Sequence, residues 1–363
     1  MAVRFRDARI AVVGGAGFIG SALILHLLND TAARVINLDA LTYAANPRSL
    51  TEAQASPRYA FERVDIRDAD ALGAAFARHR PTAIVNLAAE SHVDRSIDAP
   101  GAFVETNLMG AFTLLQEALR LWRGLDGSEK AAFRLLQVST DEVFGSLDGE
   151  GACDETAPYR PNSPYSATKA GADHLARAWG ATYGLPTIVT HGANTYGPRQ
   201  FPEKLAPMMI LRGLGLRELP VYGRGDQVRD WLHVEDHARA LALALERGAP
   251  GATYAVGGGG LRRNIDVTRA VCAALDRLAP APVPRESLIR FVADRPGHDL
   301  RYALDSSRIA RELGWRPQEN FEAGLERTVR WYLDNRAWWA PLVEGEADAL
   351  RRRGLGAAPS SPV

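Results

Sequence analysis

The sequence predicts an α/β protein with a Rossmann-type doubly wound parallel sheet and a smaller, partly interleaved C-terminal α/β domain. A glycine-rich turn follows the first apolar segment, and apolar segments then alternate with helical ones over the first 200 residues. From residue 201 the pattern changes to shorter strands and to loops rich in Gly and Arg. Alternating βα units form a parallel sheet with helices on both faces and a ligand crevice at the carboxyl ends of its strands. The predicted division is 1–200 for the first domain, with 229–258 returning to it, 201–340 for the second, and 341–363 for a tail that is loose at its end.

Composition excludes several classes of function. The 363 residues contain 43 Lys plus Arg and 43 Asp plus Glu, and a general nucleic-acid binder would need a basic surplus. No apolar run approaches the roughly 18 residues that cross a bilayer, and the N-terminus lacks the apolar core of a signal peptide. The two cysteines form no CxxC motif and no Cys/His cluster, so we expect neither a disulfide framework nor a metal site. A cytoplasmic enzyme fits these features best.

The first strand and the turn after it predict a dinucleotide site. Residues 9–13 form a short apolar strand, and glycines stand at Gly14, Gly17 and Gly20. In such a turn the first glycine permits the tight bend, the second lets backbone N–H groups approach a pyrophosphate, and the third lets the helix pack on the sheet. The predicted helix 18–29 would direct the positive end of its dipole at the phosphates.

The second strand, 34–38, ends in Asp39, about twenty residues after the last glycine. A carboxylate there accepts hydrogen bonds from the adenosine ribose and repels a 2′-phosphate, so the pattern favours NAD over NADP. Further strands are predicted at 59–64 and 83–87. The residues expected to bind NAD are Gly14, Gly17, Phe18, Ile19, Gly20, Asp39, Thr42, Asp65, Ile66, Leu87, Ala88, Ala89, Tyr165 and Lys169.

A polar segment after the apolar run 135–138 carries the predicted chemistry. Thr140, Asp141 and Glu142 stand at a predicted strand end, and Tyr165 and Lys169 are four residues apart on a helix, so they share one face. An ammonium group beside a phenol lowers the phenol's pKa, and two carboxyl groups in different environments can act separately as acid and base. A Tyr-x-x-x-Lys pattern is weak evidence alone, because it is common on surface helices. Together with the glycine turn, it predicts proton transfer on a sugar.

The remaining elements are predicted from periodicity. Helices are expected at 100–122, from the Tyr165 region to 183, at 203–214 and at 234–247, with a strand at 186–190. His92 follows a strand, which makes a ligand contact as plausible as a packing role. Basic side chains that could hold a diphosphate are Arg229, Arg262, Arg263, Arg295, His298 and Arg301, although most surface arginines only solvate a face.

These motifs together resemble the dTDP-glucose 4,6-dehydratases of the extended short-chain dehydrogenase/reductase superfamily. The resemblance covers about residues 9–338 and is sharpest at 139–145, 163–169, 201–205, 223–231 and 294–299. Related 4-epimerases lack the Asp-Glu pair, and related decarboxylases and GDP-mannose dehydratases generally have Thr-Ser-Glu at that place. The triplet Thr140-Asp141-Glu142 therefore points to the 4,6-dehydratases.

The resemblance implies a three-step reaction on dTDP-glucose. Tyr165, held as phenolate by Lys169, takes the C4 hydroxyl proton while the C4 hydride passes to NAD+, and Thr140 hydrogen-bonds the same oxygen. Glu142 then removes the C5 proton, and protonated Asp141 gives its proton to the departing C6 hydroxyl. The hydride returns to C6 and a proton to C5, which yields dTDP-4-keto-6-deoxyglucose and water with NAD retained.

The resemblance also implies a substrate site in the second domain and a homodimer built on the helix near Asn107 and the helix with Tyr165. The implied substrate residues are Ser91, His92, Asn194, Glu203, Lys204, Leu205, Arg229, Asn264 and His298. The sequence departs from the family pattern at three places. Segment 191–195 reads His-Gly-Ala-Asn-Thr where the family usually has Asn-Cys-Ser-Asn-Asn, and His233 and Phe144 stand where Tyr is usual. These departures put the nucleotide or sugar preference in doubt. The alternatives are the same chemistry on UDP-glucose or another NDP-sugar, a 4-epimerase, and a dinucleotide sensor or scaffold without activity.

Overall fold

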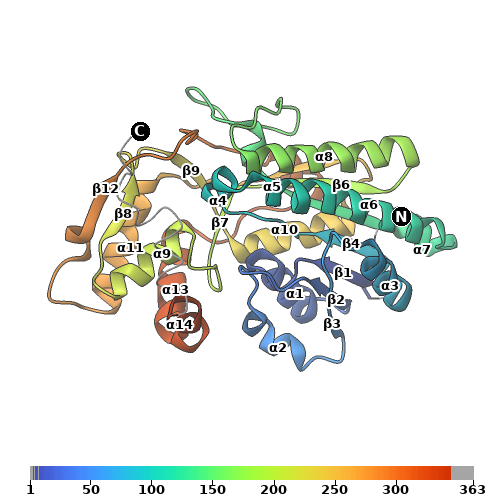
Figure 1. Cartoon of the computed structure of the whole chain (residues 1–363), viewed down its shortest axis with the longest axis horizontal. Coiled ribbons are helices and arrows are strands. Elements are labelled where there is room, and N and C mark those ends of the chain that lie inside the picture. The colour runs from blue at the N-terminus through green and yellow to red at the C-terminus, as the bar shows by residue number, and fades with distance from the viewer. Residues whose placement is uncertain (1–2, 4, 7, 345–363) are drawn as a thin grey trace.

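A computed structural model describes residues 3, 5–6 and 8–344, arranged as a large sheet domain beside a smaller lobe (Figure 1). The large sheet has seven strands in the order β10-β6-β5-β4-β1-β2-β3, and every neighbouring pair is parallel. The strands are β1 (Arg9–Val13), β2 (Arg34–Asp39), β3 (Tyr59–Arg63), β4 (Ala83–Asn86), β5 (Arg134–Thr140), β6 (Thr187–Gly192) and β10 (Thr253–Val256). This is the predicted Rossmann-type fold.

Helices cover both faces of this sheet, because successive side chains of a strand point to opposite faces. Ile10 and Val12 of β1 belong to the core beneath α1 (Phe18–Asp30) and α10 (Val234–Arg247). Ala11 and Val13 belong to the opposite core, beneath α3 (Ala69–His79), α6 (Ala111–Arg123) and α8 (Pro164–Tyr183). Buried apolar side chains on both faces fix the sheet and, with it, the edge where the strands end.

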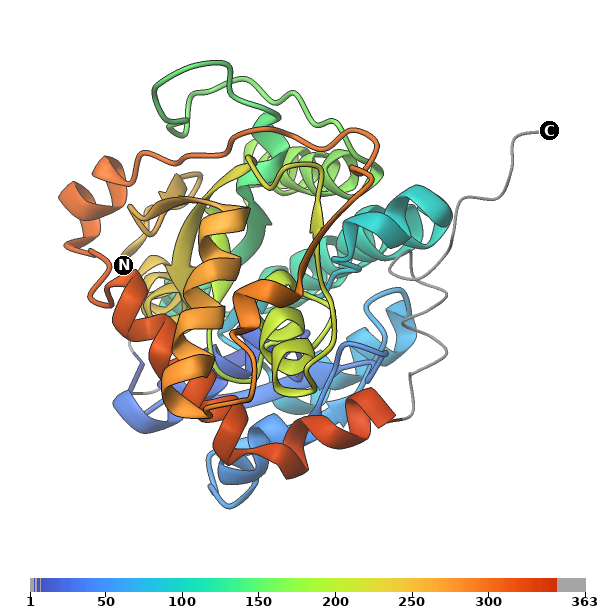
Figure 2. The ribbon, with the colours of Figure 1, turned by 90° about the vertical axis from the view of Figure 1, so that its left-hand side faces the viewer.

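The smaller lobe, which faces the viewer in Figure 2, is built mainly from residues after 193. It contains a three-stranded sheet of order β11-β9-β7 and a two-stranded sheet of β12 and β8. Its elements are β7 (Asn194–Tyr196), α9 (Leu205–Leu214), β8 (Leu219–Tyr222), β9 (Val228–His233), β11 (Leu261–Arg263), α11 (Asn264–Leu278), β12 (Ile289–Val292), α13 (Phe321–Asp334) and α14 (Arg336–Glu344). A separate apolar core, with Trp231 and Tyr332, holds these elements together. Between β9 and β11 the chain returns to the large sheet as α10 and β10.

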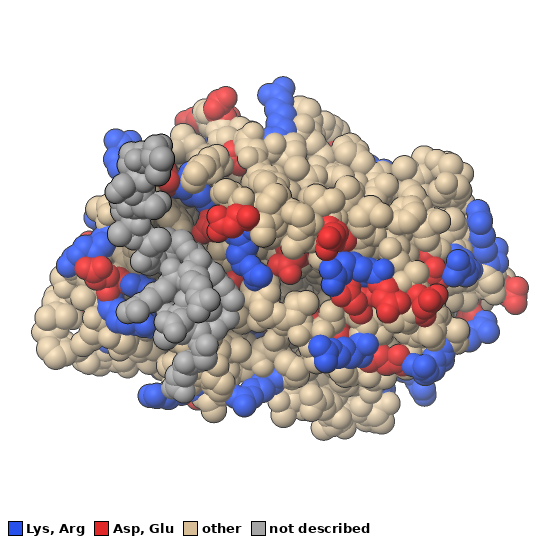
Figure 3. Space-filling model, viewed as in Figure 1, with Lys and Arg blue, Asp and Glu red and all other residues tan. Residues whose placement is uncertain are grey.

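Short helices complete the description. They are η1 (Pro47–Leu50), α2 (Thr51–Gln54), α4 (Val93–Asp98), α7 (Gly127–Ala132), η3 (Asp141–Phe144), η4 (Arg285–Leu288) and α12 (Ser307–Leu313). Basic and acidic residues are interspersed on the face shown in Figure 3. Among the described residues, no helix combines the length and the apolarity needed to span a membrane. The predicted loose end of the tail lies outside the described residues.

One predicted helix differs from the observed one. The sequence predicts a single α-helix over 100–122, but α5 (Pro100–Phe103) and α6 enclose a π-helical segment, Val104–Gly110. Within it the Asn107 amide accepts from Glu90 N at 2.9 Å and donates to Thr168 Oγ1 at 3.0 Å. A π-helical turn shifts the side-chain register of a helix, and such turns are frequent at functional sites. Here the turn carries Asn107 to the end of β4 and onto α8.

Candidate active site

Two adjoining cavities lie where strands of the large sheet end against the smaller lobe. The first, of about 310 Å³, is lined by the glycine turn and by the predicted catalytic residues. The second, of about 190 Å³, is lined mainly by residues of the smaller lobe. Seven of the described residues line both cavities, among them Glu142, Asn194 and Lys204, so the two spaces adjoin around these residues.

The glycine turn has the close backbone approaches that the sequence predicts. Gly14 has a φ of +82°, and a Cβ there would lie 2.6 Å from Ala88 N. A Cβ on Gly20 would lie 2.3 Å from Gly14 O, so a side chain would push α1 away from β1. No side chain caps the first turn of α1, whose N-cap is Gly17. The free N–H groups at this helix start suit a pyrophosphate.

Asp39 connects this turn to the end of β2. Its carboxylate oxygens accept from Ala16 N at 2.8 Å and from Leu41 N at 2.7 Å, and burial raises the pKa of the group. Each oxygen keeps a second lone pair for a ribose hydroxyl. Asp39 does not line the first cavity itself.

The other predicted dinucleotide residues divide into two groups. Phe18, Ile19, Leu87 and Ala89 line the first cavity with the three glycines. Four others do not line it. Thr42 is exposed, and Asp65 is paired with Arg67. Ile66 is buried, and Ala88 packs against Gly14. The second group would extend the site beyond the cavity at the ends of β2, β3 and β4.

All five predicted catalytic residues line the first cavity. Thr140 ends β5, and its hydroxyl accepts from Glu142 N at 3.3 Å and donates to Asp141 Oδ1 at 3.2 Å. Tyr165 lies in the first turn of α8, which begins with a capping box between Ser163 and Ser166. This cap fixes where α8 starts and therefore where Tyr165 lies opposite Thr140.

The two carboxyl groups hold their protons unusually strongly. Burial, followed by the charge of Glu142, raises the pKa of Asp141 well above its usual range. Burial also raises the pKa of Glu142, although Arg295 and Arg229 oppose the rise. Asp141 Oδ2 is buried and has no hydrogen-bond partner among the described residues, which favours the protonated form of this carboxyl group.

The Tyr165–Lys169 pair differs from the expected ammonium–phenolate pair. Burial and the charge of Glu142 raise the pKa of Tyr165, whereas burial lowers the pKa of Lys169. Lys169 Nζ donates to Val138 O at 2.7 Å. The phenol form of Tyr165 is therefore favoured in the unliganded protein.

The second cavity brings together every predicted substrate residue: Ser91, His92, Asn194, Glu203, Lys204, Leu205, Arg229, Asn264 and His298. Several of them are fixed by their neighbours. Lys204 Nζ donates to Ser91 O at 2.7 Å, and Arg229 donates to Asp299 O at 2.8 Å with its guanidinium 4.3 Å from the Tyr302 ring centroid. Arg229 and Arg295 give the cavity the positive charge that a diphosphate requires.

Three of the candidate arginines do not line this cavity. Arg262 pairs with Glu322 at 2.8 Å, and Arg263 pairs with Asp266 at 2.8 Å, both at the surface. Arg301 lines neither cavity. Conversely, the structure adds Tyr222, Tyr302, Trp231, Asp94 and His237 to the cavity walls. Trp231 ends the motif 223–231, but no site role was predicted for it or for the others, because the contacts between the two lobes bring them to the site.

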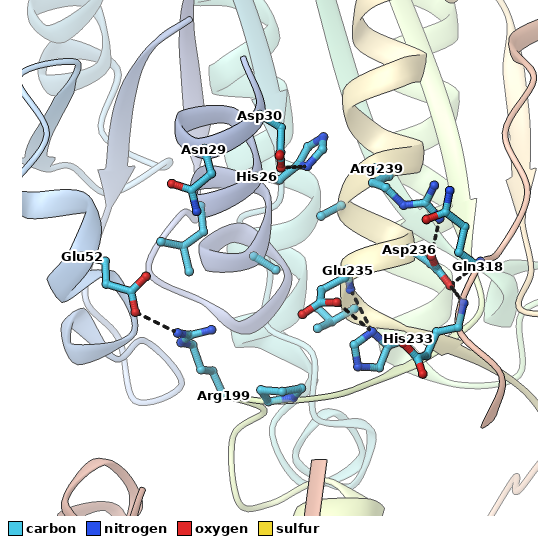
Figure 4. Close-up of a pocket in the computed structure, with 16 residues that line it drawn as sticks. His26, Asn29, Asp30, Glu52, Arg199, His233, Glu235, Asp236, Arg239 and Gln318 are labelled. Atoms are coloured by element: carbon cyan, nitrogen blue, oxygen red, sulfur yellow. Dashed lines mark hydrogen bonds and ion pairs between the residues drawn. The ribbon is translucent and has the colours of Figure 1, made fainter. Parts of the chain in front are cut away.

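A third cavity, of about 400 Å³, lies away from this site (Figure 4). It is lined by residues from the C-terminal half of α1, the start of α10 and the chain before α13, among them His233. His233, which stands where the resemblance leads us to expect Tyr, caps α10 with its ring by accepting from Glu235 N at 3.4 Å. None of the predicted site residues lines this cavity.

Comparison with known proteins agrees with this geometry. The sequence profile described as GDP-mannose 4,6 dehydratase matches residues 11–328. A dTDP-glucose 4,6-dehydratase of Neisseria meningitidis serogroup B is 54% identical over 353 residues, which are 96% of this chain and 99% of the relative. A dTDP-glucose 4,6-dehydratase from Streptomyces venezuelae, solved with NAD and TDP bound, superimposes with a TM-score of 0.84 at 47% identity, covering 92% of this chain and 99% of that one.

The fold is shared more widely than this activity. A UDP-glucose 4-epimerase from Thermus thermophilus, solved with NAD, has a TM-score of 0.80 at 31% identity and covers 90% of this chain and 99% of its own. Fold similarity alone therefore does not separate dehydratases from epimerases. Identity and coverage do establish the family: the chain belongs to the GDP-mannose 4,6 dehydratase family, together with the dTDP-glucose 4,6-dehydratases.

Proposed function

We propose that this protein is an NAD-dependent dTDP-glucose 4,6-dehydratase, a hydro-lyase that converts dTDP-glucose to dTDP-4-keto-6-deoxyglucose and water. The observation that carries the proposal is the Asp141–Glu142 pair. Both carboxyl groups have raised pKa values, and both line the cavity that Tyr165 and the glycine turn share. An elimination of water needs a base for the C5 proton and a protonated acid for the departing C6 hydroxyl, whereas a 4-epimerization needs only a base for the C4 hydroxyl.

The residues present fit NAD. The turn at Gly14 and Gly20 leaves no room for side chains, the start of α1 offers free N–H groups, and Asp39 lies where a ribose carboxylate partner belongs. When bound, NAD+ accepts the hydride from C4 and gives it back at C6, and its positive charge favours the Tyr165 phenolate.

The chain's own groups account for the proton transfers. Tyr165 takes the proton of the C4 hydroxyl, and Thr140, whose side chain is hydrogen-bonded to this phenol, orients the same oxygen. Once C4 is a ketone, the C5 proton is acidic and Glu142 removes it. The C5–C6 double bond forms as the C6 hydroxyl leaves with the proton of Asp141, so one water is released. A proton then returns from Glu142 to C5 of the reduced product.

The second cavity is assigned to the nucleoside diphosphate. Arg229 and Arg295 would neutralise the phosphates, and Lys204, fixed on Ser91 O, would hold the sugar end. The S. venezuelae relative was solved with TDP bound, which supports a thymidine nucleotide for this chain. UDP-glucose or another NDP-sugar is the second candidate, because segment 191–195 differs from related sequences at the border of both cavities.

Three further parts of the proposal concern organisation. Residues 1–200, with 229–258, would bind NAD, and 201–340 would bind the sugar nucleotide. The protein would act in the cytoplasm, in keeping with its two buried free thiols, Cys153 and Cys272. Two copies would associate through the helices near Asn107 and Tyr165, as the resemblance implies.

The deciding experiment is incubation of the purified protein with dTDP-glucose and, separately, UDP-glucose, without added NAD and with detection by mass. Loss of one water from the dTDP-sugar is expected. Loss from the UDP-sugar alone would keep the mechanism and change the nucleotide. A product of unchanged mass but altered C4 configuration would favour the epimerase, and no conversion of either sugar would favour a sensor or scaffold.

A further inference from the structure

Asp173 is a buried carboxyl group that the proposed chemistry does not use. It lies on α8 four residues after Lys169, which is itself four residues after Tyr165. Residues four apart share one face of a helix, with Cβ atoms about 5–6 Å apart, so the three side chains form a row. Tyr165 and Lys169 line the first cavity, whereas Asp173 is 0% exposed and lines neither cavity. The carboxyl group therefore lies one helical turn behind Lys169.

Three polar side chains hold this carboxyl group and form with it a carboxylate cluster of Ser139, Tyr159, Asp173 and His191. The Ser139 hydroxyl donates to Asp173 Oδ2 at 2.6 Å, and the Tyr159 hydroxyl donates to the same oxygen at 3.1 Å. His191 Nε2 lies 3.4 Å from Oδ2 and 2.6 Å from the Tyr159 oxygen. Ser139 and His191 are register partners in β5 and β6, so the cluster ties α8 to both strands. An ionised carboxylate only accepts hydrogen bonds, which suits the groups that converge on Oδ2.

Lys169 needs a negative charge nearby if it is to keep its proton. Its residue is 5% exposed, and Nζ donates to Val138 O at 2.7 Å. A backbone carbonyl offers a dipole but no net charge. Burial lowers the pKa of Lys169, and the negative charge of Asp173 opposes this fall. A buried lysine that lost this charge would release its proton at lower pH.

Two other acidic groups, on η3, line the first cavity together with Lys169. Burial, followed by the charge of Glu142, raises the pKa of Asp141 well above its usual range, so Asp141 offers no charge to Lys169. Burial raises the pKa of Glu142 as well, and the cations that most oppose this rise, Arg295 and Arg229, line the second cavity. The charge of Glu142 is therefore directed to these arginines.

The remaining elements packed against α8 bring acidic residues that are paired elsewhere or exposed. They are Asp94, which is 3.3 Å from Arg295, Glu105, which is 3.4 Å from Arg67, Glu117, which is 2.7 Å from Arg120, and Asp98, which is exposed. On α8 itself, the side chains of His174 and Arg177 lie against the Tyr159 ring. The counter-charge of Lys169 is therefore Asp173.

Resting on the proposed NAD-dependent function, we infer that Asp173 is a positioning residue for the oxidation at C4, because its carboxylate keeps Lys169 as the ammonium group that the Tyr165 base requires. Asp173 touches neither substrate nor dinucleotide and acts through Lys169. The other members of the carboxylate cluster hold Asp173 in place. His191, in the segment that departs from the family pattern, belongs to this cluster and lines neither cavity.

The test follows the protonation of Lys169 directly. The chain has three lysines, Lys130, Lys169 and Lys204, so the purified protein labelled with ¹³C at lysine Cε gives three resonances, and Lys169→Arg identifies the one from Lys169. The resonances are titrated with pH in the wild type and in Asp173→Asn, which keeps the size of the side chain and removes its charge. In this variant Lys169 should lose its proton about 1–3 pH units lower, the usual effect of one opposite charge at this range.

Tyr159→Phe is the matched control, because it removes a hydrogen bond to the same carboxylate and leaves the charge. Lys169 should titrate there as it does in the wild type. An unchanged titration in Asp173→Asn would overturn the inference, as would an equal shift in Tyr159→Phe, since both results would give Asp173 a structural role only. Where dTDP-glucose is converted, the pH above which turnover falls should move down in Asp173→Asn. If it stays in place while the Lys169 resonance shifts, Asp173 has no part in the oxidation.

The wild-type titration covers the case in which Asp173→Asn does not fold. At pH 7 the Lys169 resonance should be that of an ammonium group, and a neutral amine would overturn the inference. Because the resonance reports protonation and not turnover, the two proposals can fail separately. A protein in which Lys169 depends on Asp173, but which removes no water from either sugar, would refute only the proposed activity.

Discussion

At the scale of single residues, the surroundings of Asp141 and Glu142 support the proposed division of acid and base roles. Glu142 lines both cavities and has the charges of Arg295 and Arg229 within range. Asp141 lines only the first cavity and is more deeply buried. The cations favour ionisation of Glu142, and burial beside a carboxyl group disfavours ionisation of Asp141. This asymmetry supports the proposal that Glu142 is the base and Asp141 the acid.

Glu142→Gln should stop the reaction after oxidation at C4, because an amide cannot take the C5 proton. Turnover should fall by about 10² to 10⁴-fold, the usual contribution of a positioned general base. Addition of dTDP-glucose should leave reduced dinucleotide on the enzyme, visible by its absorbance and fluorescence. Continued turnover without that signal would assign the C5 base to another group.

Asp141→Asn should remove activity while making the fold less sensitive to pH. The pKa of Asp141 is raised in the folded protein, so its contribution to stability is complete below the unfolded pKa of about 4 and is lost as pH rises through the folded pKa. Asn cannot ionise, so the variant does not lose this stability as the pH rises. Urea unfolding from about pH 5 to about pH 9 should show stability shifting in favour of the variant. A constant difference across that range would mean that Asp141 is not protonated in the fold.

At the scale of elements, the turn between β1 and α1 uses its glycines for two different purposes. One glycine allows α1 to pack against β1, and another leaves space for the ligand to approach the backbone. Gly20 lies against Gly14 O, whereas a Cβ on Gly17 would come no closer than 3.3 Å to the same oxygen. Gly17 has a φ of −73°, which any residue adopts. Substitutions at Gly20 and Gly17 should therefore have different effects on folding stability.

Gly20→Ala should cost about 1–3 kcal/mol of folding stability through overpacking and should weaken NAD binding as α1 moves. Gly17→Ala should leave the unfolding midpoint nearly unchanged and still weaken NAD binding, since its methyl group would lie where the pyrophosphate approaches. Thermal unfolding of the stripped proteins and calorimetric titration with NAD+ measure the two effects. Equal stability losses in both variants would contradict this separation.

Elements are predictable where local pattern and tertiary environment agree. The strand 9–13, the helix 234–247 and the site at Thr140 follow from apolar periodicity and turn chemistry. The π-helical segment does not, because its register depends on Asn107 meeting Glu90 and Thr168 from other elements. The state of Tyr165 is not predictable either: spacing on α8 shows that Lys169 is near, but not that Val138 O holds its ammonium group.

At the scale of the whole molecule, two lobes meet around the cavities and each supplies what the other lacks. The large sheet brings the strand ends that carry Thr140 and the glycine turn. The smaller lobe brings Arg229 and Asn264, which reach the site only because β9 and α11 lie on either side of the chain's return to the sheet. His237, on the returning α10, belongs to the same arrangement. The predicted substrate residues, Arg229 and Asn264 among them, do line the second cavity, whereas Tyr222, Tyr302 and Asp94 were not predicted, because only the packing of the two lobes brings them there.

The same scale carries the prediction of a dimer. Val104 is 43% and Met109 is 51% exposed, and both lie on the π-helical segment that packs against α8. Large apolar side chains that share one exposed face favour an interface between copies. Because the proposed contact uses this segment and α8, a charge in its centre should be costly to bury.

Met109→Arg should therefore convert a dimer of the wild type into a monomer, as measured by light scattering during size-exclusion chromatography. Phe291→Arg is the control, since Phe291 is 59% exposed but lies on β12 of the smaller lobe. It should keep the wild-type mass. A monomeric wild type would refute the dimer, and a dimer that survives Met109→Arg but dissociates with Phe291→Arg would place the interface on the smaller lobe.

The location matters for the chemistry, because the π-helical segment also holds Asn107 on the strand end beside the active site. If the interface lies there, the monomeric variant should also lose stability around Glu90 and bind NAD more weakly, whereas Phe291→Arg should bind it as the wild type does.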